Sequence, residues 1–150
     1  MDWRSLKLSD HFALWEFACQ GAGDPCDCHG AVQVDPRIPA VLEELRALVG
    51  GPIQVTCGFR CDSHNRKVGG HVASFHRVGM AADVTSFELR KDLEGWAMKA
   101  GQIIEGRYGA EVGNVFFYPR RLFLHLDVGH RIADLVRPGE VVAAVPPGAV

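Results

Sequence analysis

The sequence lacks a long apolar run. None of its apolar stretches approaches the ~20 consecutive residues that a transmembrane helix needs. The first residues, MDWRSLKLSD, contain neither an apolar stretch nor a small-residue cleavage site, so we expect no signal peptide. These absences predict a protein that is cytoplasmic as synthesised and is not inserted into a membrane.

The sequence also lacks an excess of either charge. Its formal net charge is −2, and Lys and Arg are scattered along the chain rather than gathered in one stripe. A protein that binds nucleic acid or an anionic membrane surface usually carries a basic patch. We therefore expect no nucleic acid among the partners of this protein.

Internal repeats and low-complexity segments are absent as well. Hydrophobic residues make up 47% and charged residues 23% of the 150 residues, as in an ordinary soluble fold. A chain of this length is most simply a single domain, which we expect to be a monomer and to span residues 1–137. Residues 138–150 contain three prolines and few polar residues, which predicts an extended C-terminal tail.

Helical and strand-like patterns are mixed along the chain without regular alternation. Helical spacing of apolar residues predicts helices at 10–19, 36–49 and 87–100, and a short polar helix at 62–70. Alternating or buried apolar runs predict strands at 52–57, 81–85, 112–118 and 122–128, the last two forming a hairpin. This mixture favours an α+β fold with a small antiparallel sheet packed against helices.

Two short segments contain residues typical of a metal site. SFHRVGMAAD, residues 74–83, carries His76 and Asp83 among glycine and small residues. LFLHLDVG, residues 122–129, carries His125 and Asp127, which point to the same face of a strand. Two histidines and a carboxylate are donors that zinc accepts, and three protein ligands leave a fourth position open, as in catalytic sites. An HxD pair alone is common on half-exposed strands, so the prediction depends on the combination.

The pattern SxHxxGxAxD at residues 74–83, followed by HxD at 125–127, resembles a known enzyme family. It is similar to the zinc D-alanyl-D-alanine carboxypeptidases and the related peptidoglycan endopeptidases of phage lysins. The segment VTCGFRCDSHNRKVGG, residues 55–70, also resembles these enzymes, and the resemblance extends from Leu8 to Gly129. It implies the fold of the N-terminal domain of Hedgehog signalling proteins, with a zinc cleft on the open face of the sheet.

The resemblance implies a role for each matching polar residue. The implied zinc ligands are His76, Asp83 and His125. Arg60 would face the substrate, where its guanidinium fork would hold a terminal carboxylate or polarise the scissile carbonyl. Ser74 and Asn65 would orient the ligands and the loops around them.

The general base departs from the common pattern of the family. Many members have an acidic residue three positions before the last histidine ligand, where this chain has Leu122, which cannot transfer a proton. The branch that this chain resembles most has an aspartate two residues after that ligand, which makes Asp127 the expected general base. In the alternative, Asp127 only anchors a neighbouring side chain, and Glu111 or a histidine acts as the base.

The chain has five cysteines, and an odd number without a signal peptide argues against a complete disulfide framework. Cys19, Cys26, Cys28 and Cys61 are candidates for a second, structural zinc site, although paired CxxC spacing is missing. One disulfide among these four cysteines, or free thiols, are the alternatives. Cys57 is expected to be a small buried residue.

Together these features predict a zinc metallopeptidase that hydrolyses a peptide bond in peptidoglycan stem or cross-link peptides. Its action would be of the D,D-carboxypeptidase or endopeptidase type, at the cell wall or in the periplasm. One alternative is a non-catalytic zinc-containing binding module of the same fold, which the loss of the acid at Leu122 favours. Another is a zinc amide hydrolase that acts on a small substrate outside the wall.

Overall fold

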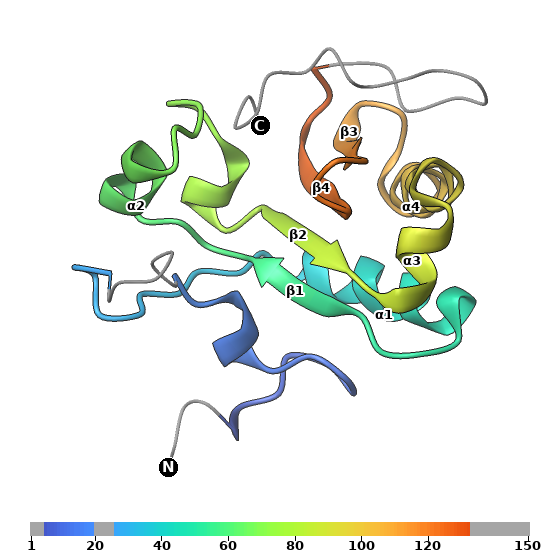
Figure 1. Ribbon diagram of the computed structural model, residues 1–150, viewed down its shortest axis with the longest axis horizontal. Helices are drawn as coiled ribbons and strands as arrows, with labels where there is room; N and C mark the ends of the chain where they lie inside the picture. Colours follow the sequence, from blue (N-terminus) through green and yellow to red (C-terminus); the bar gives the residue numbers. More distant parts are fainter. Residues whose placement is uncertain (1–4, 20–25, 133–150) are drawn as a thin grey trace.

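A computed structural model describes residues 5–19 and 26–132 of the protein, so the predicted tail and its boundary at residue 137 lie outside the described residues. Four strands form one sheet in the order β1-β2-β4-β3, and each neighbouring pair is antiparallel (Figure 1). The strands are β1 (Gln54–Cys57), β2 (Ala81–Thr85), β3 (Val112–Tyr118) and β4 (Phe123–His130). The hairpin of β3 and β4 agrees with the sequence prediction.

Helix α2 (Asp62–Lys67) and helix α4 (Leu93–Tyr108) lie at opposite ends of the molecule (Figure 1). The α-helices are α1 (Arg37–Val49), α2 (Asp62–Lys67), α3 (Phe87–Lys91) and α4 (Leu93–Tyr108), and the 3-10 helices are η2 (Leu14–Phe17) and η3 (Phe75–Val78). The predicted α+β class with a small antiparallel sheet is confirmed. No helix in the described part of the chain has the length and apolar character needed to cross a bilayer.

The hydrophobic core lies between one face of the sheet and the two longest helices. Leu124, Leu126 and Val128 project from β4 into this core, where they join buried residues of α1 and α4. Since side chains alternate along a strand, His125 and Asp127 project from the other face. The core thus fixes the face on which the two polar residues of β4 lie.

The predicted helix at residues 10–19 is wrong over most of its length. Lys7 and Ala13 form an isolated antiparallel bridge, and the Leu14 N–H donates to the Leu6 carbonyl at 2.8 Å. The chain therefore doubles back before η2, whose first turn is closed by the Glu16 carboxylate, 2.7 Å from the Ala13 N–H. Backbone pairing in this segment outweighs the helical spacing of its apolar residues.

The predicted helix at residues 87–100 is two helices, and the second extends to Tyr108. Asp92 separates them and caps α4, since its Oδ1 accepts from the Gly95 N–H at 3.0 Å. Gly101, expected to end the helix, is buried inside α4, which ends at Tyr108 with Gly109 as its C-cap. A glycine inside a helix costs about 1 kcal/mol relative to alanine, an amount that tertiary packing readily offsets.

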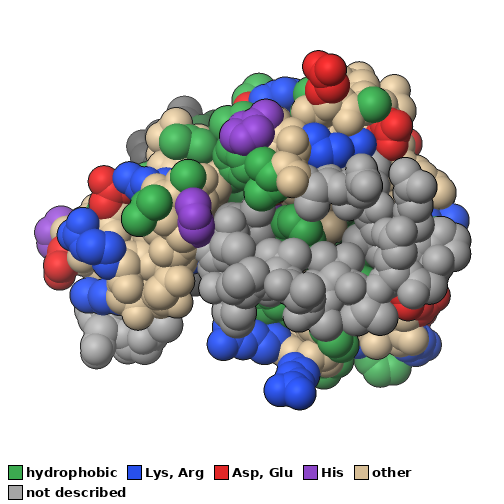
Figure 2. Space-filling model, turned by 90° about the horizontal axis from the view of Figure 1, so that it is seen from above, with side chains coloured by type: hydrophobic (Ala, Val, Ile, Leu, Met, Phe, Trp, Pro, Cys, Tyr) green, Lys and Arg blue, Asp and Glu red, His purple; other side chains and the backbone are tan. Residues whose placement is uncertain are grey.

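Charged side chains are dispersed over the face seen in Figure 2, where Lys and Arg lie at several separate places. Several charged residues of the protein are paired: Arg107 Nε lies 2.7 Å from Glu44, and Arg77 Nε lies 2.8 Å from Asp62. Exposed pairs of this kind contribute little to stability. The visible charges thus follow the scattered distribution of Lys and Arg in the sequence.

Candidate functional site

The pairing of the strands places three metal-binding residue types in one row across the sheet. Cys57 of β1 lies opposite Asp83 of β2, and Asp83 lies opposite His125 of β4. Phe116 of β3 lies opposite His125 and ends the row. Directly opposed residues of antiparallel strands project from the same face. This cross-strand row, Cys57-Asp83-His125-Phe116, therefore lies on the face of the sheet turned away from the core.

His76 reaches the row from the 3-10 helix η3. The Ser74 hydroxyl caps this helix by accepting from the His76 N–H at 3.3 Å. Gly79 ends it in the left-handed conformation, with φ of 71°, and a Cβ at Gly79 would collide with the backbone of Gln33. The His76 ring donates from Nδ1 to the Gly58 carbonyl at 2.7 Å, since a carbonyl only accepts. His76 Nε2 is therefore the nitrogen directed at Asp83 of the row.

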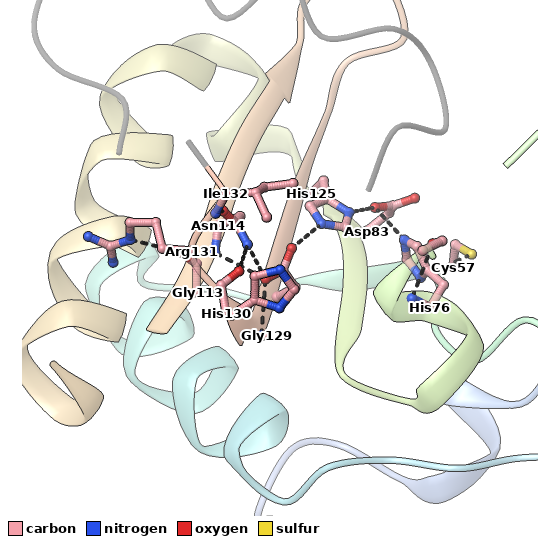
Figure 3. A network of polar contacts seen from close by, with 12 residues as sticks. Cys57, His76, Asp83, Gly113, Asn114, His125, Gly129, His130, Arg131 and Ile132 are labelled. Atoms are coloured by element: carbon pink, nitrogen blue, oxygen red, sulfur yellow. Dashed lines mark hydrogen bonds and ion pairs between the residues drawn. The ribbon is translucent and has the colours of Figure 1, made fainter. Parts of the chain in front are cut away.

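Asp83 lies between the two histidines (Figure 3). Its Oδ1 is 3.2 Å from His76 Nε2 and 3.0 Å from His125 Nδ1. The two imidazole rings meet edge to face, with centroids 5.1 Å apart, and both rings are buried. The three predicted ligands thus come together, although they lie far apart in the sequence.

Electrostatics within this group favour an additional positive charge. Burial alone would lower the pKa of His76, but the Asp83 carboxylate outweighs it and raises that pKa to about 9. Burial also opposes the charge of His125, yet Asp127 and Asp83 raise its pKa to about 9. The two histidines in turn hold the pKa of Asp83 well below its usual value, against the effect of burial. A divalent cation bound between these residues would take the place of the two extra protons that His76 and His125 carry.

Asp127 lies behind His125, on the side away from Asp83. Its Oδ2 is 2.8 Å from His125 Nε2, and its Oδ1 accepts from the Asn114 N–H, the Asn114 side-chain amide and the Gly129 N–H at 3.1, 2.9 and 3.2 Å. The carboxylate is completely buried. Asp127 thus faces Nε2 of His125, whereas Asp83 faces Nδ1 on the other side of the same ring. We refer to His76, Asp83, His125 and Asp127 as the histidine–aspartate network.

Arg60 is buried beside this network. Its backbone N–H donates to the His76 carbonyl at 2.9 Å, and its Nη2 lies 3.4 Å from the Ser74 hydroxyl. The guanidinium packs against Gly70, where a Cβ would lie only 2.6 Å from Nη1. Its Nε has no hydrogen-bond partner, and no ion pair within residues 5–19 and 26–132 includes Arg60. A buried cation without an anion is costly, so this side chain is suited to an anionic ligand.

The two residues expected to orient the site are both buried. Ser74 accepts from the His76 N–H and from Arg60, so it contacts a candidate ligand and the candidate substrate-binding residue. Asn65 donates from Nδ2 to the His71 carbonyl at 2.9 Å, and its own backbone carbonyl accepts from the Gly70 N–H at 2.8 Å. Asn65 thus holds residues 70–71 in place, and Gly70 of this segment packs against the Arg60 guanidinium.

The alternative base suggested by the sequence, Glu111, does not enter the network, and neither does Leu122, which occupies the position where many family members have an acid. Glu111 is exposed and precedes β3, five residues before the position opposite His125, which is about 17 Å along a strand. Leu122 lies in the hairpin loop in a left-handed conformation, with φ of 60°, and its side chain is 40% exposed. Within the described ranges, neither residue forms a hydrogen bond or an ion pair with His76, Asp83 or His125.

The sequence interpretation missed the positions of Cys57 and Asn114. Cys57 is half-buried with its Sγ 3.7 Å from His76 Nδ1, and one ligand atom each of Cys57, His76 and Asp83 lies within 4.8 Å of the others. Asn114 fixes the Asp127 carboxylate through two hydrogen bonds. Both positions follow from strand register, which no local motif reveals.

A second group of candidate ligands lies apart from the network and consists of cysteines. The Sγ atoms of Cys19, Cys26, Cys28 and Cys61 all lie within 4.8 Å of one another. All five cysteines have free thiols. The chain therefore brings together the four cysteines that the sequence suggested for a structural metal, without a disulfide among them.

One of the comparisons with known proteins identifies a family. No curated protein matches the chain. The family model described as Peptidase M15 matches residues 10–127, a span that contains the histidine–aspartate network, Arg60 and the four clustered cysteines. The match covers most of the chain, and the protein therefore belongs to the M15 family of zinc metallopeptidases.

Proposed function

We propose that this peptidase hydrolyses a peptide bond in peptidoglycan stem or cross-link peptides, as a D,D-carboxypeptidase or endopeptidase. The observation that carries the proposal is the position of Arg60, buried without an anionic partner among the described residues, next to two histidines and an aspartate that converge. A substrate with a free or developing negative charge close to a metal ion fits this pair of features.

His76, Asp83 and His125 would hold the zinc ion. Their two imidazole nitrogens and one carboxylate match the donors that catalytic zinc sites use. When bound, the ion supplies a Lewis acid for the scissile carbonyl and makes water a stronger nucleophile. The chain prepares the ligands: the Gly58 carbonyl fixes the tautomer of His76, and Asp127 faces the remote nitrogen of His125.

Arg60 would bind the substrate through its guanidinium. A planar fork of donors suits a terminal carboxylate, as in a carboxypeptidase substrate, or the negative charge that develops on a scissile carbonyl oxygen. Ser74 and Gly70 confine the guanidinium, so its orientation would be set before substrate arrives. Preorganised donors of this kind stabilise a transition state more than a ground state.

For Asp127 the contacts support a positioning role over that of a general base. Both carboxylate oxygens already accept hydrogen bonds, and the residue has no exposed surface. A carboxylate that receives the remote N–H of a ligand histidine fixes the ring and raises its basicity. We infer that Asp127 orients His125 and that the proton from water is accepted by another group.

Incubation of the zinc-loaded protein with a muropeptide mixture, followed by mass spectrometry, tests the proposal. Release of D-alanine would identify a carboxypeptidase, and cleavage of dimers would identify an endopeptidase. His76→Ala serves as the inactive control. The absence of any product from wall peptides, together with activity on small amides, would contradict the proposal.

A binding module is the second candidate, because an exposed leucine, Leu122, stands where many members have an acid. In that case the zinc-loaded protein would bind muropeptides without converting them. Equilibrium binding measured on the same mixture separates the two functions, since an enzyme would deplete its ligand.

A further inference from the structure

The four clustered cysteines come from three separate segments of the chain. Cys19 follows η2, Cys26 and Cys28 lie in the segment before α1, and Cys61 is the residue that caps α2. We propose that Cys19, Cys26, Cys28 and Cys61 form a closed tetrahedral zinc site that is distinct from the histidine–aspartate network. The proposal does not depend on the peptidase activity.

The distances between the sulfur atoms support a metal over a disulfide. Cys26 Sγ lies 3.3 Å from the sulfurs of Cys28 and Cys61 and 3.6 Å from that of Cys19. A tetrahedral zinc ion with Zn–S bonds of about 2.3 Å needs sulfurs about 3.8 Å apart, so modest side-chain shifts would suffice. A disulfide would join only two of these sulfurs, at about 2.0 Å, and the geometry favours no particular pair.

The backbone around the cluster is arranged as it would be around metal-bound thiolates. The Cys61 N–H points at Cys19 Sγ at 3.4 Å, and the His64 N–H points at Cys61 Sγ at 3.4 Å. The His29 N–H donates to the Cys26 carbonyl at 3.0 Å, and His29 adopts a left-handed conformation with φ of 56°. This tight turn brings Cys28 close to Cys26, and N–H groups aimed at the sulfurs stabilise their negative charge.

The cluster offers four sulfur ligands, which complete a tetrahedral shell. Cys19 and Cys26 are buried, and Cys28 and Cys61 are partly buried, so an ion here would be largely enclosed. Zinc sites with four thiolates are structural, because no coordination position remains for substrate or water. The two sites also differ in their donor atoms, because the cysteine cluster offers only sulfur whereas the network offers nitrogen and oxygen.

The proposed site would anchor the segment that carries Arg60. Cys61 directly follows Arg60, and the Phe59 N–H donates to the Phe17 carbonyl at 2.8 Å. The Cys19 N–H donates to the Ala31 carbonyl at 2.8 Å. This hydrogen bond joins the segment of Cys19 to the segment that carries Cys26 and Cys28. Bound zinc would therefore tie the N-terminal part of the chain to the end of β1 and to the substrate-binding arginine.

The first test counts and identifies the metal. The variant His76→Ala/His125→Ala removes the network site, so any zinc that remains reports on the cysteines. We expect two zinc ions per wild-type chain and one in this variant, with X-ray absorption showing only sulfur ligands at about 2.3 Å. No zinc in the variant, or zinc bound to light atoms, would overturn the proposal.

The second test assigns the ligands, with Cys57→Ser as the matched control because Cys57 lies outside the cluster. In the variant without the two histidines, Cys26→Ser should abolish zinc binding, whereas Cys57→Ser should retain it. If Cys26→Ser does not fold, a thiol-specific mercurial added to the folded parent variant should release the zinc to a chromophoric chelator. Release of no zinc, zinc binding unaffected by Cys26→Ser, or a disulfide found by non-reducing mass spectrometry would overturn the proposal.

Discussion

Replacement of Asp127 by asparagine separates the two roles that this residue has been given. In the native protein, Asp127 Oδ1 accepts from three N–H groups and Oδ2 faces His125 Nε2 at 2.8 Å. The three N–H groups would keep the oxygen of the introduced side chain on their side, because an amide NH₂ there would face only donors. The NH₂ group of the introduced amide would then point at His125 Nε2, which would have to accept a hydrogen bond.

This exchange shifts the proton of His125 to the wrong nitrogen. With Nε2 as an acceptor, the neutral ring carries its proton on Nδ1, the atom directed at Asp83 and at the proposed zinc ion. Restoring the metal-binding tautomer leaves two buried donors face to face, which costs about 1–3 kcal/mol. Zinc affinity should therefore fall roughly 10–100-fold, the range seen when groups that support metal ligands are removed.

The assay is competition for zinc against a chromophoric chelator, combined with turnover at saturating zinc. Asp10→Asn is a suitable control, since it makes the same substitution at an exposed position. We expect Asp127→Asn to bind zinc more weakly and to recover much of its turnover when zinc is saturating. Unchanged zinc affinity with a loss of turnover of about 10²–10⁴-fold would refute this reasoning and identify Asp127 as a general base.

Three further predictions concern the same site. Arg60→Lys should lower kcat/KM roughly 10²-fold with zinc content unchanged, because lysine lacks the planar fork of donors; near-native turnover would remove Arg60 from the site. Zinc binding at the network should release protons at pH 7, because both ligand histidines have pKa values of about 9 and must become neutral. The zinc affinity should therefore rise with pH until about 9, and isothermal titration in buffers of different ionisation enthalpy will count the protons. Gly79→Ala should destabilise the protein by about 1–3 kcal/mol more than Gly69→Ala in urea unfolding, since both have φ of 71° but only Gly79 packs against backbone.

The strands could be predicted from the sequence where burial alternates or is continuous. β2 and β3 have the predicted bounds, because apolar runs of that length cannot remain exposed. The segment at residues 10–19 could not be predicted, because its outcome depends on pairing between Lys7 and Ala13 and on tertiary contacts. The helical spacing of Phe12, Trp15 and Cys19 is misleading there, because Phe12 and Cys19 are buried whereas Trp15 is 46% exposed, and no α-helix joins them.

The candidate site likewise has one part that could be predicted from the sequence and one part that could not. His76, Asp83 and His125 were recognisable because each lies in a short motif, and the structure brings them together. The surroundings of Asp127 were not recognisable, because they depend on Asn114 of β3, which pairs with Asp127 of β4. The sequence indicates which residues are chemically suited to a site, whereas register determines which atoms meet.

The cross-strand row also links metal binding to the correct pairing of the sheet. A slip of one residue between β2 and β4 would bring Ala82 or Val84 opposite His125 and turn Asp83 toward the core. Such a misfolded chain would offer no pair of imidazoles around a carboxylate. A metal ion that binds only the native register stabilises that register by mass action. Zinc would therefore favour the native pairing of β2 with β4 over the slipped pairings during folding.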